Sequence, residues 1–127
     1  MQLTLENPDF RYFLRGVSAE GILVNERRLT RSFILAPNHL DEDWRPRSAA
    51  ELGADDMAPL LALAPSVVLL GTGKRLEFPS QEVMAACLTR GIGIEVMDNA
   101  AAARTFNVLA TESRKVVAGF LLPGPPG

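Results

Sequence analysis

The sequence contains very little cysteine, histidine or aromatic residue. One cysteine, Cys87, and one histidine, His39, cannot form a tetrahedral zinc site or an internal disulfide bridge. Aromatic residues make up 6% of the 127 residues and hydrophobic residues 47%, so the core is expected to be mainly aliphatic. This length allows one domain with a sizeable core. Cys87 lies on the apolar face of an expected helix and is predicted to belong to that core.

Strong charge and long apolar segments are missing as well. The formal net charge is −2, and no broad basic surface of the kind that duplex nucleic acid requires is evident. The most apolar run, residues 59–71, is too short to span a membrane and is interrupted by Pro65. The N-terminal residues do not show the basic and then apolar pattern of a secretory signal. The sequence therefore predicts a cytoplasmic protein with no nucleic-acid partner and no membrane insertion.

Familiar catalytic and cofactor-binding patterns are also missing. His39 lies in an irregular segment without a G-x-S-x-G motif, so a nucleophilic triad is not predicted. The segment Gly71-Thr-Gly-Lys-Arg75 follows an apolar strand, as a phosphate loop would, but Lys74 is not followed by Ser or Thr. This segment is either a tight exit loop or a small nest of backbone amides for an anion, assisted by Lys74 and Arg75. We expect no catalytic residue, metal or cofactor, although an enzyme with an unrecognised site is left open.

The pattern of apolar residues changes near the middle of the chain. The first part predicts antiparallel strands, a tight turn at Asn25–Glu26, and an irregular segment over 36–52 anchored by Trp44. From residue 54 onward, helical and strand patterns alternate, which is typical of parallel strands joined by right-handed crossovers. The expected strands are 10–17, 21–25, 28–35, 66–71, 91–97 and 115–122, and the expected helices are 54–64, 80–90 and 98–109.

These elements predict a single α/β domain over residues 1–122. Three layers are expected, with a central mixed β-sheet, helices on its faces, and an additional antiparallel β layer from the N-terminal part. Residues 123–127, Pro-Gly-Pro-Pro-Gly, are expected to form a disordered tail. The strand over 28–35 is expected at a sheet edge, where pairing across a twofold axis offers a route to a homo-oligomer.

One charged residue, Glu95, lies in an apolar strand that is expected to be buried on both faces. A buried carboxylate must be paired or become neutral. We therefore expect Glu95 to form a structural ion pair with Arg104 or Arg75. The alternative is that the Glu95 carboxylate lines a cleft.

The helix after this strand carries further polar residues. Asp98 is expected to cap the helix, and the alternative is a ligand contact, because open α/β sheets bind ligands at this edge. Arg104 and Asn107 share one helix face, which is either solvated surface or part of a site. The candidate site for a ligand or partner comprises Gly71, Thr72, Gly73, Lys74, Arg75, Glu95, Asp98, Arg104 and Asn107.

Four short motifs occur in a characteristic order: Gly71-Thr-Gly, Phe78-Pro79, GIGIEVMD at 91–98 and RTFNVL at 104–109. In this order and spacing they resemble the small Mth-type domain family, over residues 10–122. The family includes uncharacterised bacterial and archaeal proteins, a mitochondrial complex I assembly factor and an adipogenesis-associated protein. The resemblance implies a three-layer α/β fold with a central mixed sheet and an extra β layer. It implies no established catalytic activity.

The chain departs from this family at three positions. Members often carry Thr, Cys and Tyr where this sequence has Asn99, Ala103 and Phe106. Chemistry that rests on a thiol or a phenol at these positions is therefore not expected here.

The resemblance implies a non-enzymatic protein that binds another protein, by analogy with the assembly factor. The alternative is a small-molecule domain for an anionic metabolite. Its site would lie at the carboxyl edge of the sheet, between residues 71–73 and 98–107, where Lys74, Arg75 and Arg104 supply positive charge.

Overall fold

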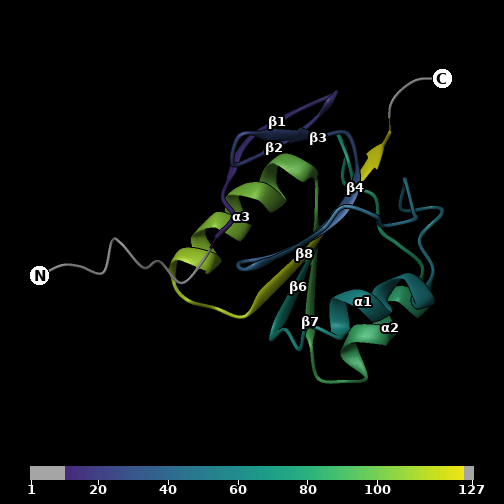
Figure 1. Cartoon of the computed structure of the whole chain (residues 1–127). Coiled ribbons are helices and arrows are strands. Elements are labelled where there is room, and N and C mark those ends of the chain that lie inside the picture. Colours follow the sequence, from purple (N-terminus) through teal and green to yellow (C-terminus); the bar gives the residue numbers. More distant parts are fainter. Residues whose placement is uncertain (1–10, 125–127) are drawn as a thin grey trace, which may run out of the picture.

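The computed structural model describes residues 11–124, which form two β-sheets with helices packed on them (Figure 1). The strands are β1 (Leu14–Ser18), β2 (Gly21–Val24), β3 (Arg27–Leu29), β4 (Arg31–Ala36), β5 (His39–Asp41), β6 (Val67–Gly71), β7 (Gly93–Met97) and β8 (Val116–Pro123). The helices are the 3-10 helix η2 (Ala54–Met57), α1 (Ala58–Leu61), α2 (Gln81–Leu88) and α3 (Asn99–Thr111).

The central sheet is mixed and has the strand order β5-β4-β8-β6-β7. β6 runs parallel to β7 and β8, whereas β4 is antiparallel to β8 and β5. A second, antiparallel sheet, β1-β2-β3, lies with α3 on one side of the central sheet, and α1 and α2 lie on the other side (Figure 1). This arrangement confirms the predicted layered α/β fold with an additional antiparallel β layer.

The core on the α3 side depends on small helical residues. Ala102, Ala103 and Ala110 are buried, so the backbone of α3 packs closely against the sheets, and the fully buried Phe106 fills the space between them. Beneath the helix, Phe33 of β4 stacks on Phe120 of β8 with ring centroids 5.1 Å apart. The alanine-rich sequence of α3 therefore reflects close packing of helix on sheet.

The core on the other side is anchored by Trp44, as predicted. The Trp44 side chain is 6% exposed, and its Nε1–H donates to the carbonyl oxygen of Asp56 over 2.9 Å. A Cβ atom at Gly119 would lie 2.6 Å from the Trp44 ring, so glycine at this position lets the ring lie across β8. The segment before η2 therefore folds back onto the central sheet through one large side chain.

An ion pair holds this segment at its outer edge. The Arg45 guanidinium donates to both carboxylate oxygens of Asp56, over 3.1 and 2.6 Å, and to the carbonyl oxygen of Glu51 over 2.6 Å. The Asp56 carboxylate also accepts the backbone N–H of Gly53 over 2.8 Å. The hydrogen bonds from Arg45 are the main reason that the pKa of Asp56 lies below its ordinary value.

Several local features of the structure confirm the sequence predictions. The Ser80 hydroxyl accepts the backbone N–H of Val83 and caps α2, and Gly91 follows that helix with φ +73°. Asn25 has φ +53° in the turn between β2 and β3. Cys87 is fully buried in the core. Burial raises the pKa of its thiol, which is the opposite of what an activated cysteine requires.

The expected single strand over 28–35 is instead two strands in different sheets. β3 pairs with β2, and β4 pairs with β8 and β5, with Thr30 at the joint between them. Residues 32–35 are buried without alternation, because β4 is covered on both faces. β4 is consequently an inner strand, and the expectation of an exposed edge over 28–35 was wrong for this half of the segment.

Other element boundaries also differ from the sequence predictions. β1 begins at Leu14, later than expected, and the predicted start at Phe10 lies outside the described residues. The segment 36–52 contains the short strand β5, and the helix expected over 54–64 is η2 followed by one turn of α1. β8 extends to Pro123, one residue into the predicted tail, and residues 125–127 lie outside the described part of the chain.

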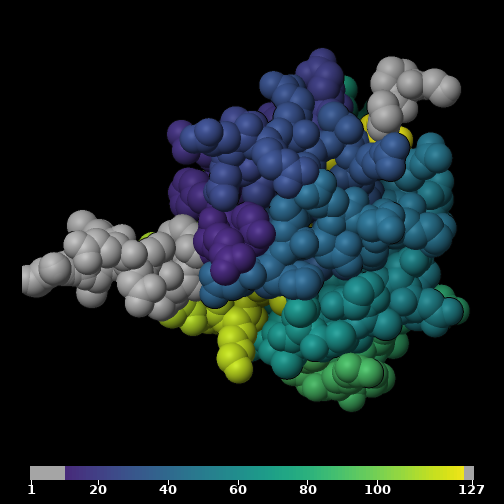
Figure 2. Space-filling model, in the orientation of Figure 1, coloured from purple at the N-terminus to yellow at the C-terminus, as the bar shows by residue number. Residues whose placement is uncertain are grey.

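β8 is the most enclosed strand of the central sheet. Residues 116–122 are all buried, because β4 and β6 flank this strand and both faces are covered. In the space-filling view of Figure 2, purple, blue and teal residues from the first part of the chain cover most of the face shown, and little of the yellow C-terminal segment is visible.

Candidate functional site

The three parallel strands end at one edge of the central sheet, and a cavity of about 720 Å³ lies there. Its walls come from the turn after β1, the loop after β6, the first turn of α3 and the end of β8, with Arg47 completing the rim. Open α/β sheets bind ligands at this edge because loops and helix starts converge on it. Five of the nine predicted site residues line the cavity: Thr72, Gly73, Lys74, Arg75 and Asp98.

The loop after β6 is organised by the buried Thr72. The Thr72 hydroxyl donates to the carbonyl oxygen of Arg75 over 2.6 Å and accepts the backbone N–H of Glu77 over 3.1 Å. The Thr72 backbone N–H donates to the carbonyl oxygen of Met97 over 2.9 Å. One side chain therefore fixes the loop that carries Lys74 and Arg75, and its backbone holds this loop against the end of β7.

Asn99, the first residue of α3, connects this loop to two other elements. Its Oδ1 accepts the backbone N–H of Gly73 over 3.1 Å, and its own backbone N–H donates to the Gly73 carbonyl oxygen over 2.8 Å. Its Nδ2 donates to the carbonyl oxygen of Leu121 in β8 over 3.0 Å. Asn99 is 3% exposed, so these bonds form in a buried environment, where they fix geometry most strongly.

Glycines at 71 and 73 make this approach feasible. A Cβ atom at Gly71 would collide with the Oδ1 atom of Asn99, so only glycine allows β6 to end this close to α3. Gly73 has φ +107°, a conformation that side chains with a Cβ atom rarely adopt. The two glycines of the Gly71-Thr-Gly motif are therefore explained by the shape of the loop.

Asp98 has the predicted capping role. Its Oδ1 accepts the backbone N–H of Ala101 over 2.8 Å, which satisfies one of the free amides at the start of α3. The residue also lines the cavity, so its negative charge contributes to the electrostatics of the site.

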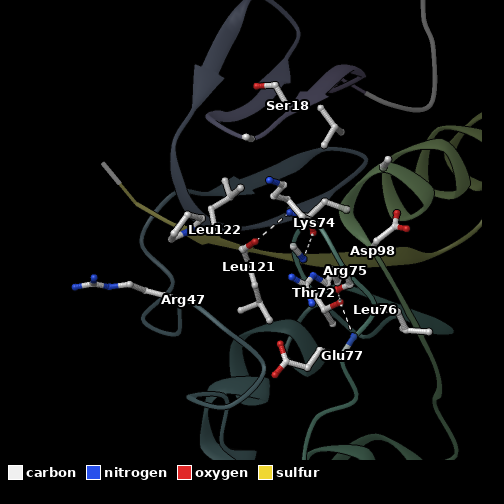
Figure 3. Close-up of a pocket in the computed structure, with 16 residues that line it drawn as sticks. Ser18, Arg47, Thr72, Lys74, Arg75, Leu76, Glu77, Asp98, Leu121 and Leu122 are labelled. Carbon is white, nitrogen blue, oxygen red and sulfur yellow. Dashed lines mark hydrogen bonds between the residues drawn. The ribbon is translucent and has the colours of Figure 1, made fainter. Parts of the chain in front are cut away.

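Three cationic side chains and two carboxylates line the cavity. In Figure 3, Arg47 lies at the left and Asp98 at the right, with Lys74 and Arg75 between them. Within residues 11–124, no salt bridge involves the side chains of Arg47, Lys74 or Arg75. Glu77 and Asp98 contribute the negative charge, which leaves a small positive excess at this edge.

The predicted ion pair of Glu95 was wrong. β7 is the outermost strand of the central sheet, so it is not buried on both faces, and Glu95 is exposed. Neither Arg104 nor Arg75 forms a salt bridge with it in the described part of the chain. Arg104 is also exposed, and neither Glu95 nor Arg104 lines the cavity.

Asn107 has a structural contact. Its Nδ2 donates to the carbonyl oxygen of Leu14 over 2.7 Å, and its Oδ1 accepts the Leu14 backbone N–H over 3.0 Å. This pair of bonds attaches α3 to β1. Asn107 therefore has a structural role that Arg104 does not share, although the two residues lie only one helical turn apart.

The sequence predictions missed two residues of the cavity with clear structural consequences, Asn99 and Arg47. Asn99 makes contacts 22 and 26 positions away in sequence, which no local pattern reveals. A polar amide directly after an Asp cap, at the start of an alanine-rich helix, was the available signal. Arg47 lay in a segment with no regular period, and only the fold brings it to the cavity.

The described residues contain no helix with the length and apolar character needed to cross a membrane. No cluster of three or more His, Cys, Asp or Glu side chains suited to a metal ion occurs among them either.

Comparisons with known proteins place this chain in a family. A family model described as "Protein of unknown function (DUF498/DUF598)" matches residues 14–121. The NADH dehydrogenase (ubiquinone) 1 alpha subcomplex assembly factor 3 of Homo sapiens is 32% identical over 117 residues, which is 91% of this chain and 62% of that protein. The chain thus spans less than two thirds of this curated relative.

Solved structures show the same fold. The solution structure of a Xanthomonas campestris protein has a TM-score of 0.85 and 50% identity, and the match covers all of this chain and 96% of that chain. A Bordetella pertussis protein described as a Mth938-like domain has a TM-score of 0.77 and 28% identity, over 89% of this chain and 87% of that chain. The chain therefore belongs to the DUF498/DUF598 family of proteins of unknown function and is related to an NADH dehydrogenase assembly factor.

Proposed function

We propose that this chain is a non-enzymatic factor that binds another protein and acts in assembly. The observation that carries the proposal is its similarity to an assembly factor over 117 residues, which is 91% of this chain. The relative is longer than this chain, so the identity of its partner is not transferred.

An exposed aromatic side chain supports the proposal. Phe78 is 68% exposed, on the loop between β6 and α2, and Leu76 beside it is 53% exposed. Exposed apolar side chains that lie near one another mark interaction sites on many proteins, and aromatic residues dominate the energetics of many interfaces. The Thr72 hydrogen bonds fix the first part of the loop, so Leu76 is presented by an ordered backbone.

The proposal is tested by partner recovery with matched variants. The tagged chain is expressed at its native level in its own host, and co-purifying proteins are quantified by mass spectrometry. We expect one stoichiometric partner with the unmodified chain, and a reduced recovery with Phe78→Ser, whose affinity should be lower by about 30-fold or more because losing an aromatic anchor costs about 2 kcal/mol or more. Val108→Ser is the control, since Val108 is 55% exposed on α3 and away from this loop.

Two results would contradict the proposal. One is the absence of any stoichiometric partner for the unmodified chain, after crosslinking as well as without it. The other is an equal loss of the partner with both variants, which would mean that Phe78 is not an anchor. Thermal unfolding midpoints of the two variants establish that both remain folded.

A further inference from the structure

The cavity at the carboxyl edge holds unused hydrogen-bond donors that partner binding does not explain. The backbone N–H groups of Lys74, Arg75 and Leu76 donate to no acceptor within residues 11–124. These three residues are consecutive, and all of them line the cavity. Successive free amides in a bent loop form a concave site with positive potential, which suits an anion.

The side chains of the same loop add full positive charges. Lys74 and Arg75 belong to the segment with the free amides, and Arg47 lies across the cavity from Asp98 (Figure 3). Two carboxylates oppose them, but Asp98 is engaged as a helix cap. The start of α3 is therefore less suited to an anion than the loop after β6, because Asp98 already satisfies an amide there.

The cavity also has an apolar part, and its size is that of a small-molecule site. Val17, Ala19 and Pro123 line this part and have accessible apolar surface. The cavity volume of about 720 Å³ lies inside the usual range for ligand pockets, about 300–1,000 Å³. A ligand that fits both parts has one strongly charged end and an apolar body.

The conformation of the loop is also fixed in the absence of a ligand. Gly73 is held from both sides by Asn99, and the turn over Thr72–Glu77 is closed by the Thr72 hydroxyl. A preformed site loses little conformational entropy on binding, so a few charge-assisted hydrogen bonds suffice for measurable affinity.

From these observations we propose that the cavity binds a soluble phosphomonoester with an apolar body. The phosphate, which carries about two negative charges and three acceptor oxygens, accepts hydrogen bonds from the amides of residues 74–76 and pairs with Lys74 and Arg75. The apolar body lies against Val17, Ala19 and Pro123. Phe78, the anchor of the proposed partner site, does not line the cavity, so the ligand and the partner have separate anchors, although Leu76 borders both.

The proposal is tested by titration of the isotopically labelled chain with phenyl phosphate, followed by amide NMR at constant ionic strength. Saturable shifts are expected for the amides of Gly73, Lys74, Arg75 and Leu76. Inorganic phosphate is expected to bind more weakly at the same amides, and phenol, which lacks the charge, is expected to cause no saturable shift there. Phenyl phosphate shifts that never saturate, or that spread evenly over all basic surfaces, would overturn the proposal.

Charge reversal locates the site. The double variant Lys74→Glu and Arg75→Glu is expected to weaken binding of phenyl phosphate about tenfold or more, because charge-assisted hydrogen bonds are lost. Arg90→Glu is the control, since Arg90 is exposed between α2 and β7, at the opposite edge of the sheet. An equal loss of phenyl phosphate affinity with Arg90→Glu would mean that overall charge causes the effect, and it would reject the site. If the double variant does not fold, Lys74→Ala alone replaces it, because Lys74 is exposed.

Two further measurements are informative. Vesicle binding distinguishes a soluble ligand from a membrane headgroup, and the Phe78→Ser variant distinguishes the cavity from the partner site. Binding to vesicles that contain phosphatidic acid, without binding of phenyl phosphate, would show that the loop recognises a membrane headgroup and would reject a soluble ligand. Phe78→Ser is expected to retain the affinity for phenyl phosphate, so failure of the partner proposal leaves this one intact. Loss of phosphate binding in Phe78→Ser would contradict the separation of the two sites.

Discussion

The two faces of the central sheet are closed in different ways. On the side of α1 and α2, one large ring, Trp44, lies across Gly119 and uses a single polar atom, its N–H, to reach Asp56. On the α3 side, the carboxamides of Asn99 and Asn107 tie the helix to Gly73, Leu121 and Leu14. The first face is therefore closed mainly by one large ring, whereas on the second face directional hydrogen bonds add to the packing around Phe106.

The directional hydrogen bonds of Asn99 lie beside the cavity. Packing of an aromatic ring tolerates small displacements, whereas hydrogen bonds of a buried carboxamide lose strength steeply when the geometry changes. A loop that presents backbone amides to a ligand needs a fixed conformation, and Asn99 supplies it from the α3 side. We therefore expect changes on the two faces to differ in kind as well as in size.

The largest effect is expected for Trp44→Ala. Removal of this buried ring leaves a cavity on the α1 and α2 side, and such a change costs about 3–5 kcal/mol of unfolding free energy. Urea unfolding measures the cost. Trp44→Phe, which keeps most of the volume and loses the N–H, should cost less than Trp44→Ala. Equal costs for the two variants would mean that the hydrogen bond to Asp56, and not ring volume, closes this face.

A smaller loss of unfolding free energy is expected for Asn99→Ala, together with a change in the loop after β6. The substitution leaves the buried Leu121 carbonyl without its partner, at about 1–3 kcal/mol, whereas the part-buried Gly73 N–H donates to water instead. The amide signals of residues 73–76 should move in the NMR spectrum. Asn107→Ala removes another pair of bonds and should destabilise the fold while leaving those signals in place. A loop that stays unchanged in Asn99→Ala would refute the directional role of this residue.

The pair Gly71→Ala and Gly119→Ala compares the two faces with the same added methyl group. These glycines lie on neighbouring strands and face opposite cores, toward Asn99 and toward Trp44. Each variant should lose about 1–3 kcal/mol through overpacking, measured by chemical unfolding. Only Gly71→Ala should weaken binding of phenyl phosphate, because only it displaces Asn99. Equal weakening by both would show that the faces are not independent.

The smallest effect concerns the Arg45–Asp56 pair beside Trp44. The pKa of Asp56 is lowered in the folded chain, so the charged carboxylate contributes stability above its ordinary pKa. That contribution is lost as the pH falls through the lowered value. Asp56→Asn should therefore have a lower melting temperature than the unmodified chain at pH 7, and the difference should shrink below the ordinary value of 3.8.

The control for this pH dependence is Asp55→Asn. Asp55 is exposed, and none of the salt bridges within residues 11–124 includes it. Its melting temperature should follow that of the unmodified chain at every pH. A gap between Asp56→Asn and the unmodified chain that stays constant down to acid would rule out the carboxylate charge as the cause.

Local signals in the sequence predicted most of the fold. The caps at Ser80 and Asp98, the stop at Gly91 and the turn at Asn25 depend on neighbours within a few residues, and all of them were confirmed. Trp44 was recognised because a single large ring in an irregular segment must be buried somewhere.

The errors came from features that depend on distant pairing. An apolar strand reads the same at the centre of a sheet and at its edge, so Glu95 was assigned to a buried strand when β7 is the edge. The expected strand breaks at Thr30 because β3 pairs with β2 whereas β4 pairs with β8, and the local sequence does not reveal these partners. In the candidate site, the loop was identified from its glycines and cations, whereas Asn99 was missed because its contacts span more than 20 residues.

The place of β8 has a consequence for biosynthesis. Among the described strands it leaves the ribosome last, yet β4 and β6 both pair with it and not with each other. Until β8 has emerged from the exit tunnel, the nascent chain keeps two groups of strands apart and their inner edges open. Such edges are aggregation-prone. The two halves of the central sheet can therefore join only after β8 has been synthesised.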